Sequence, residues 1–147
     1  MKPKKGISVT RIYPFEKLVK QKLPLFTARI SAGFPSPAED YLDKKLDLNE
    51  YLIKHPASTF FVRVEGDSMI DAGIHSGDIL IVDRALEPNA NKIVIAAVDG
   101  ELTVKRIKKA GDKLYLLAEN PDYPLIEITS EMNFEIWGIV TYVIHKV

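Results

Sequence analysis

The fold of this chain is organised around the stretch VEGDSMI, residues 64–70. Apolar residues alternate from Phe60 to Val64, which predicts a strand that ends at a Gly-Asp turn. A serine at such a junction can expose its hydroxyl while neighbouring backbone N–H groups point the same way. Ser68 is therefore a candidate nucleophile, with the N–H groups of Ser68 and of Asp67 or Met69 as candidate oxyanion donors. The alternative is an ordinary turn, in which the serine only ties down a loop.

The sequence on both sides of this stretch has the pattern of an all-β domain. Two strand-like runs, residues 92–98 and 101–107, lie on either side of Asp99-Gly100. Their separation by two residues favours a hairpin with a type I′ turn. The strand-like range 78–82 contains a continuous apolar run after Asp78, which is typical of a strand that is buried on both faces. About seven strands are expected, in the ranges 59–64, 78–82, 92–98, 101–107, 114–118, 126–128 and 134–143. The pattern predicts a mainly β fold with pairing between distant segments.

Residues 1–46 have the pattern of an arm. Prolines at positions 3, 14, 24, 35 and 37 interrupt every candidate helix, because proline lacks the backbone N–H and clashes with the preceding turn. Many apolar residues lie between these prolines, so we expect an extended arm with short ordered pieces on a surface. Asp47 then opens a short helix as its N-cap, with Glu50 three residues later. The expected domains are an N-terminal arm, 1–46, and a β-rich domain, 47–147.

The composition excludes several kinds of site. The chain has no cysteine, which excludes disulfides, thiol nucleophiles and thiolate metal sites. Its three histidines are scattered without metal-ligand spacing, so we expect no metal and no cofactor. No apolar run reaches the roughly 20 residues of a membrane span, and the N-terminus lacks the apolar region of a signal peptide. The expected location is the cytoplasm.

The net charge of zero conceals two oppositely charged parts of the chain. Residues 1–32 hold eight basic residues and one acid, a net of +7, whereas residues 33–147 hold 12 basic and 19 acidic residues, a net of −7. A basic tail can bind nucleic acid, or it can dock on its own acidic body. The charge pattern leaves both possibilities open.

Lys105 is a candidate general base, because it lies between branched residues in the middle of a predicted strand. An ordinary lysine has a pKa near 10.4 and is protonated at neutral pH. Burial in apolar surroundings can lower that pKa by about 3–5 units. A neutral lysine can take the proton of Ser68, and serine–lysine pairs are a known variant of the catalytic triad. The alternative is a lysine that faces solvent from its strand.

Several ordered blocks resemble the LexA/UmuD-type serine-lysine autopeptidases, and within them the UmuD type of SOS mutagenesis protein. The blocks that would carry the site are GDSM at 66–69, SGDILIVD at 76–83 and ELTVK at 101–105. Further blocks are FPSPAEDY at 34–41, IVIAAVDG at 93–100, and the turns NP at 120–121 and YP at 123–124. The resemblance covers roughly residues 24–147. It implies that family's β-rich peptidase fold, with Ser68 as nucleophile and Lys105 as general base.

The resemblance also implies self-cleavage within the arm. In this family the scissile bond joins a small residue to glycine, a few tens of residues before the serine. Only Ala32-Gly33 fits that description here. UmuD itself has a cysteine in place of Ala32, whereas the related repressors have alanine. The 35 positions from Gly33 to Ser68 can span about 100 Å or more when extended, so cleavage can occur within one chain or between two.

The partners follow from the family resemblance alone. It implies that an activated RecA filament on single-stranded DNA stimulates the cleavage. The shortened form would then act with a UmuC-like Y-family polymerase in translesion DNA synthesis. A homodimer is also implied, and the apolar run at 134–144 suits either an interface or a central strand. No direct DNA binding and no membrane association are expected.

Three other interpretations of the sequence remain. A LexA-like repressor needs a DNA-binding domain, which 32 residues broken by prolines are not expected to hold. A type I signal peptidase uses a similar serine and lysine but needs a membrane anchor. A non-catalytic assembly module of the same fold would leave Ser68 and Lys105 inactive. Beside the serine, the Asp67 side chain is expected to hold the turn, and Met69 to pack beside the substrate or in the core.

Overall fold

The computed structural model describes residues 8–14, 22–26 and 42–147, which divide into two compact units. One unit combines residues 8–14 with residues 57–147, and the other contains residues 22–26 and 42–56. In the described residues, no helix is long and apolar enough to cross a membrane.

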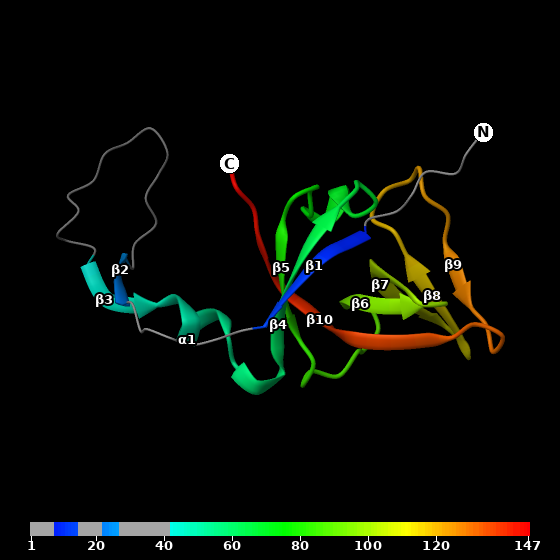
Figure 1. The fold of residues 1–147 in the computed structure, drawn as a ribbon, viewed down its shortest axis with the longest axis horizontal. Coiled ribbons are helices and arrows are strands. Elements are labelled where there is room, and N and C mark those ends of the chain that lie inside the picture. Colours follow the sequence, from blue (N-terminus) through cyan, green and yellow to red (C-terminus); the bar gives the residue numbers. More distant parts are fainter. Residues whose placement is uncertain (1–7, 15–21, 27–41) are drawn as a thin grey trace. The chain divides into compact units, whose positions relative to one another are not determined.

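The larger unit is built on one eight-stranded antiparallel sheet (Figure 1). Its strand order is β1-β4-β5-β10-β6-β7-β8-β9. The strands are β1 (Ser8–Pro14), β4 (Thr59–Glu65), β5 (Ile79–Asp83), β6 (Ile93–Val98), β7 (Glu101–Ala110), β8 (Lys113–Leu117), β9 (Ile126–Ile128) and β10 (Phe134–Ile144). The seven strands expected after residue 47 are all present, and the mainly β fold is confirmed.

The predicted hairpin turn and the predicted helix cap are both present. Asp99 and Gly100 have φ values of 49° and 84°, as a type I′ turn requires at both central residues. In the smaller unit, β2 (Lys22–Phe26) pairs antiparallel with β3 (Leu42–Asp47), and α1 (Leu48–Leu52) follows. The Asp47 side chain accepts a hydrogen bond from the N–H of Asn49 at 2.9 Å, which makes it the predicted N-cap of α1.

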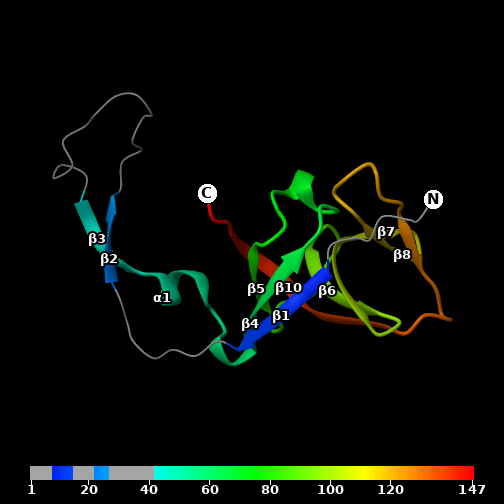
Figure 2. The same ribbon diagram turned by 45° about the horizontal axis from the view of Figure 1, so that its top comes forward.

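The first strand, β1, joins two distant parts of the main sheet. It lies along β4 (Figure 2), where Ser8 pairs with Glu65. The same Ser8 also pairs with Thr103 of β7. Strands β1, β4, β5, β10, β6 and β7 therefore form a ring that closes at Ser8. The sequence predicted only an arm at residues 8–14, because these pairings join segments far apart in the chain; the functional division at residue 46 stays a prediction.

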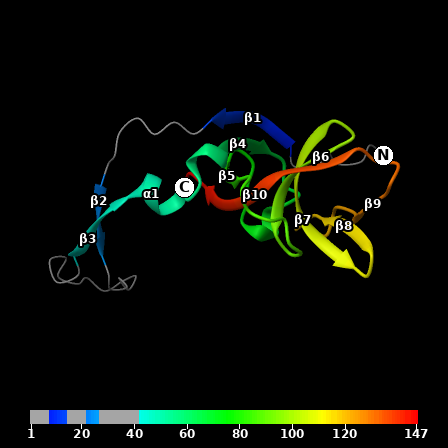
Figure 3. The same cartoon turned by 90° about the horizontal axis from the view of Figure 1, so that it is seen from below.

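Two clusters of buried apolar side chains hold the sheet together. The first contains Val62, Val64, Met69, Ile74, Leu80, Val82, Ile95 and Val104, and the second Val94, Ala96, Ile107, Leu116 and Ile139. The long strand β10 pairs with both β5 and β6 (Figure 3). Because Val64 and Met69 both belong to the first cluster, the core fixes the chain on either side of Ser68.

Gly138 allows β10 to approach β5 closely at an irregularity in its pairing with β6. A Cβ atom at this position would lie 2.6 Å from Val82 Cγ1 and 3.2 Å from the carbonyl oxygen of Asp83. Val82 is fully buried, so it has little room to move. We expect Gly138→Ala to lower the free energy of unfolding by about 1–3 kcal/mol, as overpacking of a core does. Urea denaturation measures this, and a midpoint equal to that of the wild type would contradict the packing argument.

Candidate active site

The sheet brings Ser68 and Lys105 together, although 37 positions separate them in the chain. Ser8 of β1 pairs with Glu65 at the end of β4 and with Thr103 within β7. Ser68 follows Glu65 by three residues, and Lys105 follows Thr103 by two. The closure of the sheet at Ser8 therefore positions both side chains.

The Lys105 ammonium nitrogen contacts the serine hydroxyl directly. Lys105 Nζ donates a hydrogen bond to Ser68 Oγ at 3.1 Å. It also donates to Thr103 Oγ1 at 3.0 Å and to the carbonyl oxygen of Val104 at 3.1 Å. Ser68 is fully buried, and Lys105 is only 4% exposed. Lys105 is therefore not the solvent-facing strand lysine of the alternative interpretation.

Burial changes the acidity of this lysine. Loss of water around the charged form lowers the pKa of Lys105 from 10.5 to about 8. Among the described residues, the ammonium of Lys105 has hydroxyl and carbonyl partners and no carboxylate. Such a buried charge is costly, because these hydrogen bonds replace full hydration only in part. About a tenth of the Lys105 side chains are thus neutral at pH 7, whereas an exposed lysine is almost fully protonated at that pH.

Hydrogen bonds hold the residues on both sides of Ser68, Asp67 and Met69, in place. Asp67 accepts a hydrogen bond from the Tyr123 hydroxyl on its side chain, and its carbonyl oxygen accepts one from Asn120 Nδ2 at 2.9 Å. Met69 is fully buried, and its sulfur accepts a bond from the N–H of Glu119 at 3.4 Å. The carboxylate of Asp67 raises the pKa of Tyr123 to about 12, chiefly through their hydrogen bond. In the structure the Asp67 side chain holds the turn, and Met69 packs in the core.

Sequence reasoning missed the residues that support the pair. Thr103 adjoins Lys105 on β7, and Asn120 and Tyr123 lie more than 50 positions from the aspartate that they contact. In the sequence, the turns at 120–121 and 123–124 are blocks of the family resemblance, and nothing in them indicates a role beside Ser68. The candidate cleavage residues Ala32 and Gly33 fall between β2 and β3 in the sequence and lie outside the described residues.

The mainly β fold and the contact between Ser68 and Lys105 together indicate a class of protein. A mainly β fold with a buried serine–lysine contact has the polar groups of serine–lysine hydrolases, in which lysine replaces histidine as the base. The chain belongs to the Peptidase S24-like family, which matches residues 24–141. This confirms the expected LexA/UmuD-type family, and the matched range agrees with the extent of the resemblance.

Individual relatives cover most of the chain. Protein SamA of Salmonella typhimurium is 49% identical over 135 residues, which cover 92% of this chain and 94% of SamA. Protein MucA of Escherichia coli is 45% identical over 121 residues and covers 82% of each chain. The LexA repressor of Stenotrophomonas maltophilia is 37% identical over 141 residues, which cover 92% of this chain but 66% of the repressor.

Proposed function

We propose that this chain is a UmuD-type autopeptidase that cuts itself between Ala32 and Gly33, with Ser68 as nucleophile and Lys105 as general base. The hydrogen bond of 3.1 Å between Lys105 Nζ and Ser68 Oγ, inside a buried site, carries the proposal. Membership of a peptidase family is the second support.

The partners of Lys105 suit its neutral form as well as its charged form. An ammonium has three N–H donors, and three acceptors surround it: Ser68 Oγ, Thr103 Oγ1 and the Val104 carbonyl. A neutral amine keeps two donors, for Thr103 and Val104, and its lone pair can accept the Ser68 hydroxyl proton. Loss of one proton thus reverses the bond to Ser68 and leaves the other two in place. That reversed bond is what a general base needs.

The reaction then follows in two steps. Ser68 Oγ attacks the carbonyl carbon of Ala32 while its proton passes to Lys105 Nζ. Lys105 returns a proton to the nitrogen of Gly33 as the peptide bond breaks, which leaves an ester between Ala32 and Ser68. Water hydrolyses this ester with Lys105 again as the base. The backbone N–H of Ser68, with that of Asp67 or Met69, is proposed to stabilise the oxyanion.

The burial of Ser68 is consistent with a reaction that is slow until an activator makes the hydroxyl accessible. A peptide bond can reach a fully buried hydroxyl only after surrounding groups move. We propose that a RecA filament on single-stranded DNA favours the accessible form. The shortened chain, residues 33–147, would then act as a homodimer with a UmuC-like Y-family polymerase in translesion synthesis during the cytoplasmic SOS response. After the cut, strand β1 is held to the sheet only by noncovalent contacts. Release of residues 1–32 would take away a net charge of +7 and leave an acidic chain for that polymerase to bind.

The mass of the products tests the proposal. Full-length protein is incubated at about pH 10, where a lysine with a pKa of about 8 is neutral, beside Ser68→Ala and the matched variant Ser130→Ala on an exposed turn. We expect two fragments that meet between Ala32 and Gly33 from the wild type and from Ser130→Ala, and none from Ser68→Ala. An uncut wild type, or cutting that survives Ser68→Ala, would favour a non-catalytic assembly module of the same fold.

A further inference from the structure

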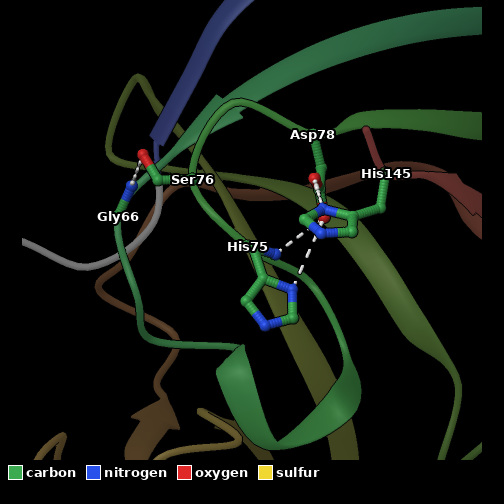
Figure 4. Close-up of polar contacts among 5 residues, drawn as sticks. All are labelled: Gly66, His75, Ser76, Asp78 and His145. Atoms are coloured by element: carbon green, nitrogen blue, oxygen red, sulfur yellow. Dashed lines mark hydrogen bonds and ion pairs between the residues drawn. The ribbon is translucent and has the colours of Figure 1, made fainter. Parts of the chain in front are cut away.

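A second group of polar side chains lies away from the serine–lysine pair. His75, Asp78 and His145 converge so that one ligand atom from each lies within 4.8 Å of the others (Figure 4). The two imidazole rings are tilted against one another, with centroids 4.8 Å apart. Two imidazoles and one carboxylate are a donor set that transition metals use in proteins.

The strand register brings these residues together. In the antiparallel pairing of β5 with β10, Ile144 lies opposite Ile79. One residue beyond that pair, the chain carries Asp78 before β5 and His145 after β10. His75 precedes Asp78 by three residues. Spacing along the sequence gave no metal-ligand pattern for the histidines, because 67 positions separate Asp78 from His145.

Asp78 is a fixed anchor for the cluster. Its side chain is 3% exposed. One carboxylate oxygen, Oδ2, accepts a hydrogen bond from the backbone N–H of His75 at 2.8 Å. The other, Oδ1, lies 2.6 Å from His145 Nδ1. The carboxylate therefore cannot turn away, whereas both histidine side chains are about half exposed and can adjust.

One nitrogen of the cluster lacks a partner that a metal would supply. His75 Nδ1 is buried and has no hydrogen-bond partner among the described residues. It lies 3.9 Å from Asp78 Oδ2. An imidazole nitrogen that is buried without a partner is destabilising. A cation between the rings and the carboxylate would pair with this nitrogen.

We propose that His75, Asp78 and His145 bind one divalent transition-metal ion, with Zn²⁺ as the best chemical match. Zn²⁺ takes histidine nitrogen and carboxylate oxygen at about 2.0–2.2 Å in tetrahedral geometry, so its ligand atoms lie about 3.4 Å apart. The two histidine rings are half exposed, so small rotations of these rings can bring the distances between the ligand atoms to about 3.4 Å. Each histidine binds the metal through a ring nitrogen that carries no proton, so metal binding displaces any proton from that nitrogen. Water completes the coordination, because three protein ligands leave one position open.

The metal would link the end of β10 to the loop that follows the serine turn, and this loop is bonded back to the residues just before Ser68. Ser76 lies between the two ligands of the loop, and its hydroxyl accepts a hydrogen bond from the N–H of Gly66 at 3.2 Å (Figure 4). The N–H of Gly77 donates to the carbonyl oxygen of Val64 at 2.7 Å. Metal binding should therefore raise the melting temperature of the larger unit, since it adds a ligand that only the folded state can hold.

Calorimetric titration with Zn²⁺ tests the site. The protein is the full chain without an affinity tag, carrying Ser68→Ala so that residues 1–147 stay together. We expect one Zn²⁺ per chain and a higher melting temperature. His75→Gln and His145→Gln should each weaken binding by about 100-fold, since the loss of even an indirect partner costs a metal site 10–100-fold. The matched variant His55→Gln removes the third histidine, which lies in the other unit, and should leave the affinity unchanged.

Histidine NMR spectra provide a readout that needs no variant at the site. Addition of Zn²⁺ should shift the ring signals of His75 and His145 together and leave those of His55 in place. Absence of binding, equal affinity in all three histidine variants, or a shift confined to His55 would each overturn the proposal.

Discussion

Replacing Lys105 by alanine should lower the rate of self-cleavage by at least about 10⁴-fold, a loss typical of removing a member of a catalytic unit. Lys105 Nζ lies 3.1 Å from Ser68 Oγ, in position to take its proton. Lys108, which is exposed on the same strand, provides the matched control, and Lys108→Ala should cut at the wild-type rate. The measurement is the fraction of cut chain over time at pH 9, by intact mass. Equal rates for Lys105→Ala and the wild type would exclude Lys105 as the base.

The pH dependence of the wild-type rate follows from the lowered pKa of Lys105, about 8. Only the neutral amine can accept the Ser68 proton, so the rate should rise with pH. About a tenth of the amine is neutral at pH 7 and about nine tenths at pH 9, which predicts a roughly tenfold increase and a plateau above pH 9. A rate that levels off only above about pH 10.4 would instead indicate an ordinary lysine, and a rate that keeps rising tenfold per pH unit beyond about pH 11 would indicate attack by hydroxide.

The features that the sequence predicted well are those set by neighbouring residues. The Asp99-Gly100 hairpin and the Asp47 cap depend on a few adjacent residues, and both are present. Ser68 is a candidate because it follows the end of a predicted strand at a Gly-Asp turn, and Lys105 because it lies in the middle of a predicted strand. The order of the surrounding blocks also resembles that of a family. Their contact was an inference from that resemblance, and the structure supplies the distance and the burial.

The features that the sequence did not predict depend on pairing across the sheet. Nothing near Ser8 indicates that it pairs with both Glu65 and Thr103. Nothing near Asp78 indicates that the register of β5 and β10 places His145 beside it. Side chains that meet only because distant strands pair leave no periodic pattern in the sequence. Patterns among neighbouring residues therefore cannot reveal these contacts.

Replacing Lys105 by methionine should slightly stabilise the folded protein at pH 7 while it abolishes cleavage. A pKa lowered from 10.5 to about 8 means that the folded state bears a cost of about 3 kcal/mol for the charged form, at 1.36 kcal/mol per unit. Methionine has a similar length and no charge. It gives up the hydrogen bonds to Ser68, Thr103 and Val104, worth about 1 kcal/mol each. The net gain in unfolding free energy at pH 7 should therefore be small, about 0–1 kcal/mol.

The sign of the pH dependence distinguishes this explanation from simple repacking. Between pH 8 and pH 10.5 the unfolded chain holds the Lys105 proton and the folded chain does not. The free energy of unfolding of the wild type should therefore rise with pH across this window, and the advantage of Lys105→Met should shrink toward pH 10.5.

Urea denaturation at pH 7 and pH 10 measures the difference, with Lys108→Met as the exposed control. A Lys105→Met variant that is less stable at pH 7, or whose advantage is the same at both pH values, would mean that the buried lysine carries no ionisation cost. A gain confined to low pH would instead identify Lys105 as a residue kept at the expense of stability for the sake of its proton chemistry.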